Sequence, residues 1–485
     1  MTISKIKILH DMLKSGEISC VELTQKYIDS IKAENDKLNA YVFTTEDLAL
    51  EQAKAVDEKI KNGEEIGLLE GIPMTLKDNI STNGIETTCC SKILTGYKPI
   101  YDAFVWNELK KQGAILLGKT NMDEFAMGST CETSYYGGAS NPHNLNHVPG
   151  GSSGGGASAV SGNIAVYALG SDTGGSIRQP ASFCGVVGLK PTYGAVSRYG
   201  LVAFASSLDQ IGPITTSVED AAIVFDAISG QDYYDSTSSG AKETTADKLN
   251  NDIKGVKIGI PKEYYEGLTE DVKTALDNAI EKYKELGAEI VHFDLPIVKY
   301  ALPVYYILAC AEASSNLGRY DSIRYGYRTK NYNGIHDMMC KTRSEGFGSE
   351  VKRRILLGTY VLSSGYYDAY YKKAQNLRGT IVKAFKEAFE KCDVILTPTV
   401  PMTAFEKNRK TSSAVENYQT DICTVPVNIA GLPGVSIPCG FDKEGMPIGM
   451  QIIGNSFEES KILNVAYKFE QATDFYKKAE MGVEF

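Results

Sequence analysis

The sequence predicts an α/β protein built around a sheet. Strand-like and helical segments alternate between residues 72 and 119, and a second strand–helix–strand pattern occupies residues 256–293. Such alternation is typical of a sheet whose strands are joined by helices. The 485 residues, 43% hydrophobic and 23% charged, have the composition of a globular protein with a sizeable core.

The N-terminal segment, about residues 1–65, is predicted to be helical. Apolar side chains recur at helical spacing over residues 18–34, where Ser19 and Glu22 match the capping-box pattern that begins many helices. A polar-rich helix is expected over residues 45–62.

The remaining elements follow from local hydrophobic patterns and turn residues. Apolar runs predict strands at 72–77, 113–119, 256–260 and 288–293. Helical periodicity predicts helices near 102–111, 270–286, 362–391 and 457–472. Two strands around Asp442–Gly445 have the pattern of a hairpin.

The net charge and the spacing of the cysteines disfavour several classes of protein. The formal net charge of −10 disfavours a grip on nucleic acid by this chain alone. The sequence has neither a signal-like start nor an apolar run long enough to span a membrane, which favours a cytoplasmic protein. The ten cysteines lack paired C-x-x-C spacing, so we expect reduced thiols and no structural zinc or other metal site.

Glycine and serine are concentrated between Pro149 and Lys190, where eleven of the 46 glycines fall. A flexible linker is one explanation for such a composition. Apolar blocks such as Ile164–Leu169 interrupt the segment, however, and they need burial. We therefore predict a packed region in which glycine permits close backbone approach.

A motif that resembles a nucleotide-binding loop precedes this region. Residues Gly113–Thr120 match G-x-x-x-x-G-K-[ST] letter for letter. The four intervening residues are Ala-Ile-Leu-Leu, which indicate a buried strand rather than a loop with free amides. We expect Lys119 to end a strand and not to bind phosphate.

Three positions indicate nucleophilic chemistry. Ser152 and Ser176 stand in two glycine-rich loops, and Lys77 ends an apolar strand. A serine hydroxyl needs a partner that takes its proton. Histidine usually does so, and His143 and His147 are the nearest upstream, but they lie in a segment typical of a surface loop. A buried lysine can serve instead, because burial lowers its pKa from about 10.4 by several units.

These residues resemble the amidase signature family. The family's Gly-Gly-Ser-Ser-Gly-Gly stretch stands at 150–155, and its Asp-x-Gly-Gly-Ser-Ile-Arg-x-Pro stretch at 172–180. The resemblance implies a catalytic triad of Lys77, Ser152 in a cis peptide, and the nucleophile Ser176. It also implies a single amidase domain over 1–485, with a large mixed, mainly parallel twisted sheet covered by helices on both faces and a helical insertion at about 295–392.

Other residues of the two motifs are expected to assist this triad. The main-chain amides of Thr173, Gly174, Gly175 and Ser176 are predicted to form an oxyanion hole. Further residues are interpreted as supports of the loops, and these are Ser153, Asp172 and Arg178.

Segments outside the motifs resemble one branch of the family, the amidase subunits of tRNA-dependent amidotransferases. These segments are 197–213, 319–328, 350–355, 363–371 and 424–434. This resemblance implies hydrolysis of glutamine through an acyl-enzyme on Ser176. Ammonia would then pass to a partner kinase/transamidase subunit that contacts the tRNA and uses ATP and Mg²⁺, so this chain would hold no cofactor. A small third subunit is also implied, and the sequence leaves open glutamyl-tRNA(Gln) or aspartyl-tRNA(Asn) as acceptor.

Free glutamine carries a carboxylate and an ammonium group, which need opposite charges in the pocket. The resemblance places Arg354 on the carboxylate, Asp421 on the ammonium and Tyr305 in the lining of the site. The run Lys352–Arg354 also suits a solvated helix face. Two rival functions stay open from the sequence: a stand-alone amide hydrolase and an inactive scaffold that keeps the fold.

Overall fold

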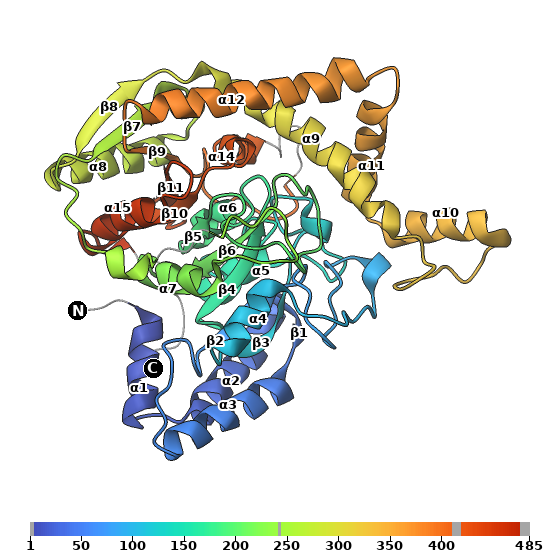
Figure 1. Cartoon of the computed structure of the whole chain (residues 1–485), viewed down its shortest axis with the longest axis horizontal. Coiled ribbons are helices and arrows are strands. Elements are labelled where there is room, and N and C mark those ends of the chain that lie inside the picture. Colours follow the sequence, from blue (N-terminus) through green and yellow to red (C-terminus); the bar gives the residue numbers. More distant parts are fainter. Residues whose placement is uncertain (1–3, 241–243, 410–418, 476–485) are drawn as a thin grey trace.

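A computed structural model describes residues 4–240, 244–409 and 419–475 of the chain. Eleven strands form one sheet through its centre (Figure 1). Their bounds are β1 Tyr41–Thr44, β2 Pro73–Lys77, β3 Ile115–Thr120, β4 Tyr167–Asp172, β5 Val187–Lys190, β6 Gln210–Thr215, β7 Lys257–Pro261, β8 Glu289–Phe293, β9 Val394–Pro398, β10 Gly434–Phe441 and β11 Pro447–Ile453. Across the sheet they follow the order β1-β3-β2-β4-β6-β5-β10-β11-β9-β7-β8.

The sheet is mixed, as predicted, but it is not mainly parallel. Strand β2 runs parallel to β3 and β4, and β7 runs parallel to β8 and β9. The other six pairings are antiparallel. Parallel neighbours need a crossover of about a dozen residues or more. Only residues 442–446 separate β10 from β11, so this pair forms the predicted hairpin instead.

The described segments contain fourteen α-helices, six of which lie mostly within the ranges predicted for individual helices. They are α1 Lys5–Ser15, α2 Cys20–Leu38, α3 Glu46–Lys61, α4 Phe104–Lys111, α5 Gly154–Ser161, α6 Arg178–Cys184, α7 Val218–Ile228, α8 Glu270–Glu285, α9 Ala301–Asn316, α10 Gly334–Gly346, α11 Ser349–Leu362, α12 Lys373–Phe389, α14 Val425–Ala430 and α15 Glu459–Gln471. The capping box of α2 is present, with the Ser19 and Glu22 side chains each bonded to the other residue's main chain.

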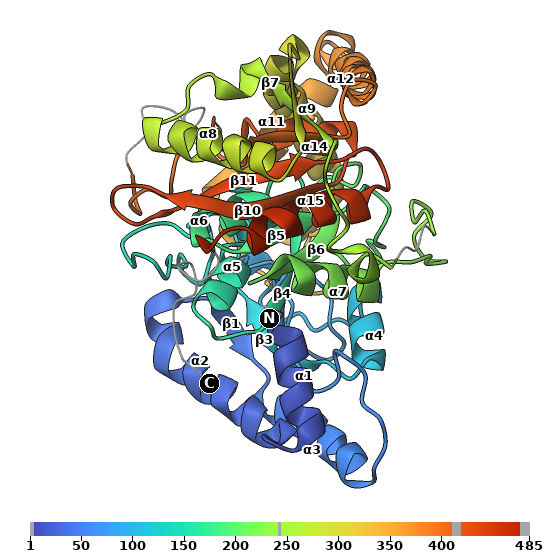
Figure 2. The ribbon, with the colours of Figure 1, turned by 90° about the vertical axis from the view of Figure 1, so that its left-hand side faces the viewer.

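Helices cover both faces of the sheet. Alternate residues of β4 belong to different cores: Leu169 packs in the cluster that contains α7 and α15, and Ala168 in the cluster that contains α5 and α6. Successive side chains of a strand point to opposite faces, so the two helix pairs lie on opposite sides. Figure 2 shows α7, α8 and α15 together on the face toward the viewer. The glycine-rich segment is therefore packed, as predicted, and α5 is buried along its whole length.

A second part of the molecule, residues 296–389, is built from helices and turns, and it contains no strand. In Figure 1, α10 and α11 extend away from the sheet at one end of α9. The long helix predicted over 362–391 is wrong at its start, because α11 ends at Leu362 and α12 begins at Lys373. Ser363, Ser364 and Gly365 interrupt the helix, and serine and glycine are weak helix formers. A π-helical turn, Tyr367–Lys372, leads into α12.

None of the described helices is long and apolar enough to cross a membrane. All ten cysteines lie in described segments and are free thiols, and only Cys340 is exposed.

Candidate active site

The site begins at the end of β2, where Lys77 is carried into the interior. The strand is buried along its length, and the Lys77 side chain is 1% exposed. Its Nζ lies 2.6 Å from Oγ of Ser152 and 2.9 Å from Oγ of Ser153. The structure thus joins the end of a strand to the loop before α5. The peptide bond between Gly151 and Ser152 is cis.

The contacts of Lys77 suit a neutral amine. Its third partner is the main-chain oxygen of Ser171, at 3.2 Å. The Ser153 hydroxyl also lies 3.2 Å from this oxygen and donates to it, so Ser153 accepts from Lys77. A neutral amine has two N–H donors and one lone pair. Donation to Ser153 and Ser171 leaves the lone pair facing the Ser152 hydroxyl.

Burial shifts the Lys77 amine toward its neutral form. Burial lowers the pKa of Lys77 to about 8, although the carboxylates of Asp123, Asp172 and Asp209 act in the opposite direction. About a tenth of the Lys77 side chains are therefore uncharged at pH 7, far more than the ordinary pKa of about 10.4 would give. The amine is placed and tuned to accept a proton from Ser152.

Ser176 lies in the turn between β4 and α6. Its side chain is 8% exposed, whereas Ser152 is fully buried. The main-chain amide of Ser153 donates to the main-chain oxygen of Ser176 at 3.1 Å, so the two serine loops lie directly against each other. Of the two hydroxyls, that of Ser176 is the one that a substrate can reach.

The glycines before Ser176 are required by their neighbours. A Cβ on Gly174 would lie 2.7 Å from the Tyr305 ring, and a Cβ on Gly175 would lie 2.2 Å from Oγ1 of Thr424. Gly175 also has a φ of 133°, a backbone conformation that residues other than glycine rarely adopt. Two separate elements, α9 and the segment before α14, therefore close on this turn.

One predicted oxyanion donor has another partner. The amide of Gly175 donates to Oδ1 of Asp172 at 2.8 Å, so it is already engaged and we remove it from the predicted oxyanion hole. The Asp172 carboxylate also accepts from the amide of Ile177, at 3.1 Å. Thr173, Gly174 and Ser176 stay as the predicted donors.

Asp172 and Arg178 form a fully buried ion pair beneath the turn. The guanidinium Nε and Nη2 donate to the two carboxylate oxygens at 3.1 and 3.0 Å. Its remaining N–H groups donate to three acceptors, which are the oxygens of Thr424, Gln451 and Asn428. Although burial alone would raise the pKa of Asp172, Arg178 holds it well below its ordinary value. The pair therefore ties the nucleophile turn to α14 and β11.

Replacing Arg178 with methionine is expected to lower the free energy of unfolding by about 3–5 kcal/mol, because it leaves Asp172 charged and unpaired in the interior. Urea titration followed by circular dichroism measures the change. Lys284→Met, which breaks an exposed ion pair with Glu281, is the matched control and should cost no more than about 1 kcal/mol. An Arg178→Met protein as stable as this control would contradict the structural role of the pair.

The three residues predicted to bind glutamine come from three separate elements. Tyr305 on α9 is buried and packs against Gly174. Arg354 on α11 is 4% exposed, and its guanidinium lies 5.2 Å from the ring centre of Tyr306. Arg354 is therefore not part of a solvated helix face, although Arg353 beside it is exposed.

Two side chains of opposite charge, Arg354 and Asp421, act on Tyr305. The pKa of Asp421 is raised to about 7, because the effect of burial exceeds the opposing effect of the nearby positive charge of Arg354. Burial likewise raises the pKa of Tyr305, on which Arg354 and Asp421 act with opposite sign. The structure thus places Tyr305 against the Ser176 turn, within the influence of Asp421 and of Arg354, which is itself paired with Glu350.

Sequence reasoning missed residues that connect the serine loops to Asp421. Gln179 accepts from the amide of Gly151 at 2.9 Å and donates to the main-chain oxygen of Ser129 at 2.9 Å. The hydroxyl of Ser129 donates to Asp421 at 3.3 Å. Gln179 occupies a variable position of the motif at 172–180, so its type carried no signal. Ser129 stands outside both motifs.

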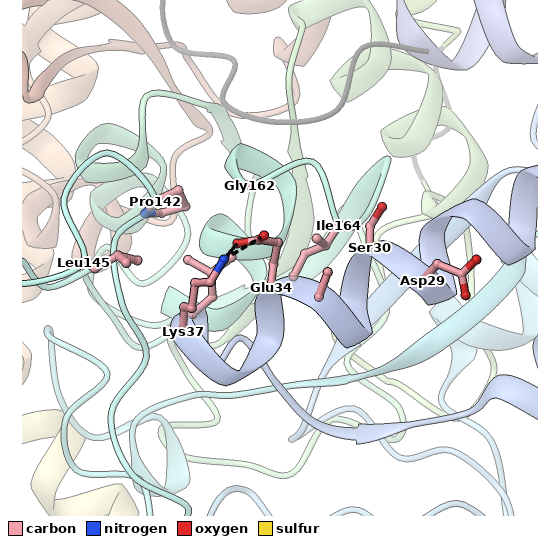
Figure 3. Close-up of a pocket in the computed structure, with 10 residues that line it drawn as sticks. Asp29, Ser30, Glu34, Lys37, Pro142, Leu145, Gly162 and Ile164 are labelled. Atoms are coloured by element: carbon pink, nitrogen blue, oxygen red, sulfur yellow. Dashed lines mark hydrogen bonds and ion pairs between the residues drawn. The ribbon is translucent and has the colours of Figure 1, made fainter.

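Two other features do not belong to the site. Lys119 lies in β3 as predicted, and its Nζ donates to the oxygen of Ile80 at 2.9 Å and to Thr87 at 2.8 Å. The pocket in Figure 3, between α2 and the loop that contains Pro142 and Leu145, is lined by none of the predicted site residues. Within the described segments, no group of three or more His, Cys, Asp or Glu side chains is arranged to hold a metal ion.

This fold and this site are typical of one class of enzyme, the amide-hydrolysing serine enzymes, and a buried lysine stands beside Ser152 where a histidine base would be expected. Comparison with known proteins places the chain in a family of amide-hydrolysing enzymes. The family model described as Amidase matches residues 22–463, and the chain belongs to this family, the amidase signature family.

The most similar relatives in the comparisons share one name within this family. The chain is 57% identical to the A subunit of the glutamyl-tRNA(Gln) amidotransferase of Thermoanaerobacter pseudethanolicus, over 97% of both chains. The crystal structure of the corresponding protein from Thermotoga maritima is 40% identical, with a TM-score of 0.79 over 95% of both chains. A bacterial aryl acylamidase of the family has a TM-score of 0.86 at 26% identity over 97% of both chains.

Proposed function

We propose that this chain is the glutaminase subunit of a tRNA-dependent amidotransferase. It hydrolyses glutamine and supplies ammonia to a partner subunit, which converts a misacylated glutamyl-tRNA(Gln), or aspartyl-tRNA(Asn), to the correctly paired product. Relatives that carry the name of this glutamyl-tRNA(Gln) amidotransferase component are 52–57% identical over nearly the full chain. Three solved structures named as other amidases are 26–29% identical.

The chemistry proposed for this chain is an acyl transfer through Ser176. Neutral Lys77 takes the proton of Ser152, which takes that of Ser176, and Oγ of Ser176 attacks the carboxamide carbon. The amides of the turn stabilise the oxyanion. The proton then returns to the leaving nitrogen, the C–N bond breaks and ammonia departs. Water hydrolyses the ester to glutamate, and Ser176 regains its proton.

One observation carries the choice of a free amino-acid amide as substrate: the opposite charges of Arg354 and Asp421 both act on buried Tyr305, which packs against the Ser176 turn. A simple amide has no charged groups to offer these side chains, of which Arg354 already forms an ion pair with Glu350 and Asp421 accepts from Ser129. Glutamine offers a carboxylate to Arg354 and an ammonium to Asp421. Its carboxamide can then reach the Ser176 turn, against which Tyr305 packs.

The proposal divides the work between subunits. The partner subunit contacts the tRNA and uses ATP and Mg²⁺ to activate the carboxylate of the misacylated amino acid. A small third subunit joins the pair, and the complex works in the cytoplasm, where aminoacyl-tRNA is used. The net charge of −10 agrees with leaving the tRNA to the partner.

The test is an assay of the complex purified by a tag on this chain together with its genomic neighbours. We expect glutamine-dependent conversion of glutamyl-tRNA(Gln), and aspartyl-tRNA(Asn) is the second acceptor to be assayed. Ammonium chloride in place of glutamine is the control for the partner's activity. A lone chain that hydrolyses simple amides at full rate, with no tRNA-dependent product from the complex, would favour the stand-alone amidase instead.

A further inference from the structure

The N-terminus of α11 is held by a residue far away in the sequence. Gly348, the residue before this helix, has no side chain with which to cap it. The carboxylate of Glu124 fills this place: the Gly348 amide lies 3.1 and 2.9 Å from its two oxygens. A negative charge at this end of a helix is also favoured by the helix dipole.

The fit between Glu124 and Gly348 leaves no spare room. A Cβ on Gly348 would lie 2.3 Å from Oε2 of Glu124, so only glycine admits the carboxylate at this distance. The hydroxyl of Ser91 also donates to Oε1. Glu124 is 3% exposed, and burial raises its pKa to about 7 against the effect of these two bonds. A buried carboxylate is costly unless it is bonded in this way.

Helix α11 carries Arg354, and its first turn also bonds this side chain. Glu350 accepts from Nε of Arg354 at 2.7 Å. Farther along, α11 lies directly against α9, because a Cβ on Gly358 would lie 1.9 Å from the main-chain oxygen of Cys310 (Figure 1). The helix is thus fixed to α9 near its C-terminal half and to Glu124 at its start. Arg354 lies between these two attachments.

Glu124 belongs to the same short segment as Ser129. This segment follows β3 and is folded around Asp123, which accepts from the amide of Cys131 at 2.9 Å. Ser129 donates to Asp421, the residue proposed for the ammonium group. One segment of the chain is therefore bonded to Asp421, through Ser129, and to the helix that carries Arg354, through Glu124.

We propose that Glu124 is a positioning residue for glutamine. By bonding the Gly348 amide it fixes the start of α11 and so sets where the Arg354 guanidinium stands relative to the Ser176 turn. The inference rests on the proposed role of Arg354. It adds that substrate specificity depends on Glu124: this residue does not touch the substrate, but the preference for an amide that carries an α-carboxylate requires it.

The test compares two substrates in the glutaminase assay of the assembled complex. One is glutamine, and the other is 4-aminobutanamide, which lacks the α-carboxylate. For Glu124→Ala we expect the KM for glutamine to rise about tenfold with kcat within twofold, since the loss is that of one helix cap. The kcat/KM for 4-aminobutanamide should stay within twofold. Glu124→Gln keeps an oxygen for the Gly348 amide and should restore the glutamine KM to within about threefold.

Gly348→Ala perturbs the same contact from the other side and should raise the glutamine KM in the same selective way, even if Glu124→Ala does not fold. Glu345→Ala on the neighbouring α10 is the matched control, because its carboxylate bonds Tyr327 and Thr329 away from α11. It should behave as wild type.

Arg354→Met separates this inference from the proposed function. It should abolish the preference for glutamine over 4-aminobutanamide. If it does so while the folded Glu124 and Gly348 variants lower kcat equally on both substrates, or change nothing, Glu124 is only a structural residue and the inference fails alone. If Arg354→Met leaves the preference intact, the proposed carboxylate site is wrong and the inference is overturned with it.

Discussion

Replacing Ser176 with alanine is expected to reduce glutamine hydrolysis by a factor on the order of 10⁴ to 10⁶, because the hydroxyl that attacks the carboxamide is lost. In the assembled complex, transamidation supported by ammonium chloride should stay near the wild-type rate. Ser176 bonds the neighbouring loop through its main-chain oxygen, so the change leaves that contact in place. Release of glutamate from glutamine and formation of amidated tRNA are the two measurements.

Ser158→Ala is the matched control for this experiment. Ser158 is also fully buried, on α5, but its hydroxyl donates to the main-chain oxygen of Ser140, outside the site. We expect the control to keep its glutaminase activity within about twofold, since it loses one ordinary hydrogen bond. Loss of both glutamine-dependent and ammonium-dependent activity in Ser176→Ala would contradict the division of work between the subunits.

Replacing Lys77 with methionine should be nearly as damaging. Methionine has a similar length, but its thioether sulfur is far too weak a base to take the proton of Ser152, and loss of a general base typically costs about 10²- to 10⁴-fold in kcat. Thermal unfolding of the variant checks that the fold survives. A glutaminase rate within tenfold of wild type would contradict the neutral-lysine mechanism.

The pH profile tests the same mechanism in the wild-type enzyme. Burial lowers the pKa of Lys77 to about 8, so the charged, inactive form dominates below that pH and the neutral form above it. We expect kcat to rise as the pH increases through about 8, and the rise to be absent from the residual activity of Lys77→Met. Asp421 titrates in the same direction, but it acts on glutamine binding and so on KM.

Local patterns predicted much of the fold. The capping box of α2, the strands on either side of α4 and the hairpin of β10 and β11 all follow from neighbouring residues, and the structure confirms them. The direction of the strands in the sheet was predicted wrongly, because pairing joins strands that are far apart in the sequence. Strand β5, for example, pairs antiparallel with both β6 and β10.

Part of the candidate site was also predictable from local sequence, and part was not. Motifs identified the glycine-rich loops of Ser152 and Ser176, and the structure places Lys77 beside Ser152, at the end of a buried strand. No motif revealed that the Gly175 amide bonds Asp172, that Gln179 connects Gly151 with Ser129, or that Glu124 caps α11. Each of these depends on side-chain geometry rather than on residue type.

The sequence alone determined the chemistry available to this protein: two hydroxyls, an amine at the end of an apolar strand and amides free of bulky side chains. Only the tertiary structure decided how far that chemistry is realised. A lysine can act as a base when packing removes it from water, and the charges of Arg354 and Asp421 act on one tyrosine because the fold brings α9, α11 and the segment before α14 together. Burial and distance between remote segments belong to the folded chain, and no stretch of sequence states them by itself.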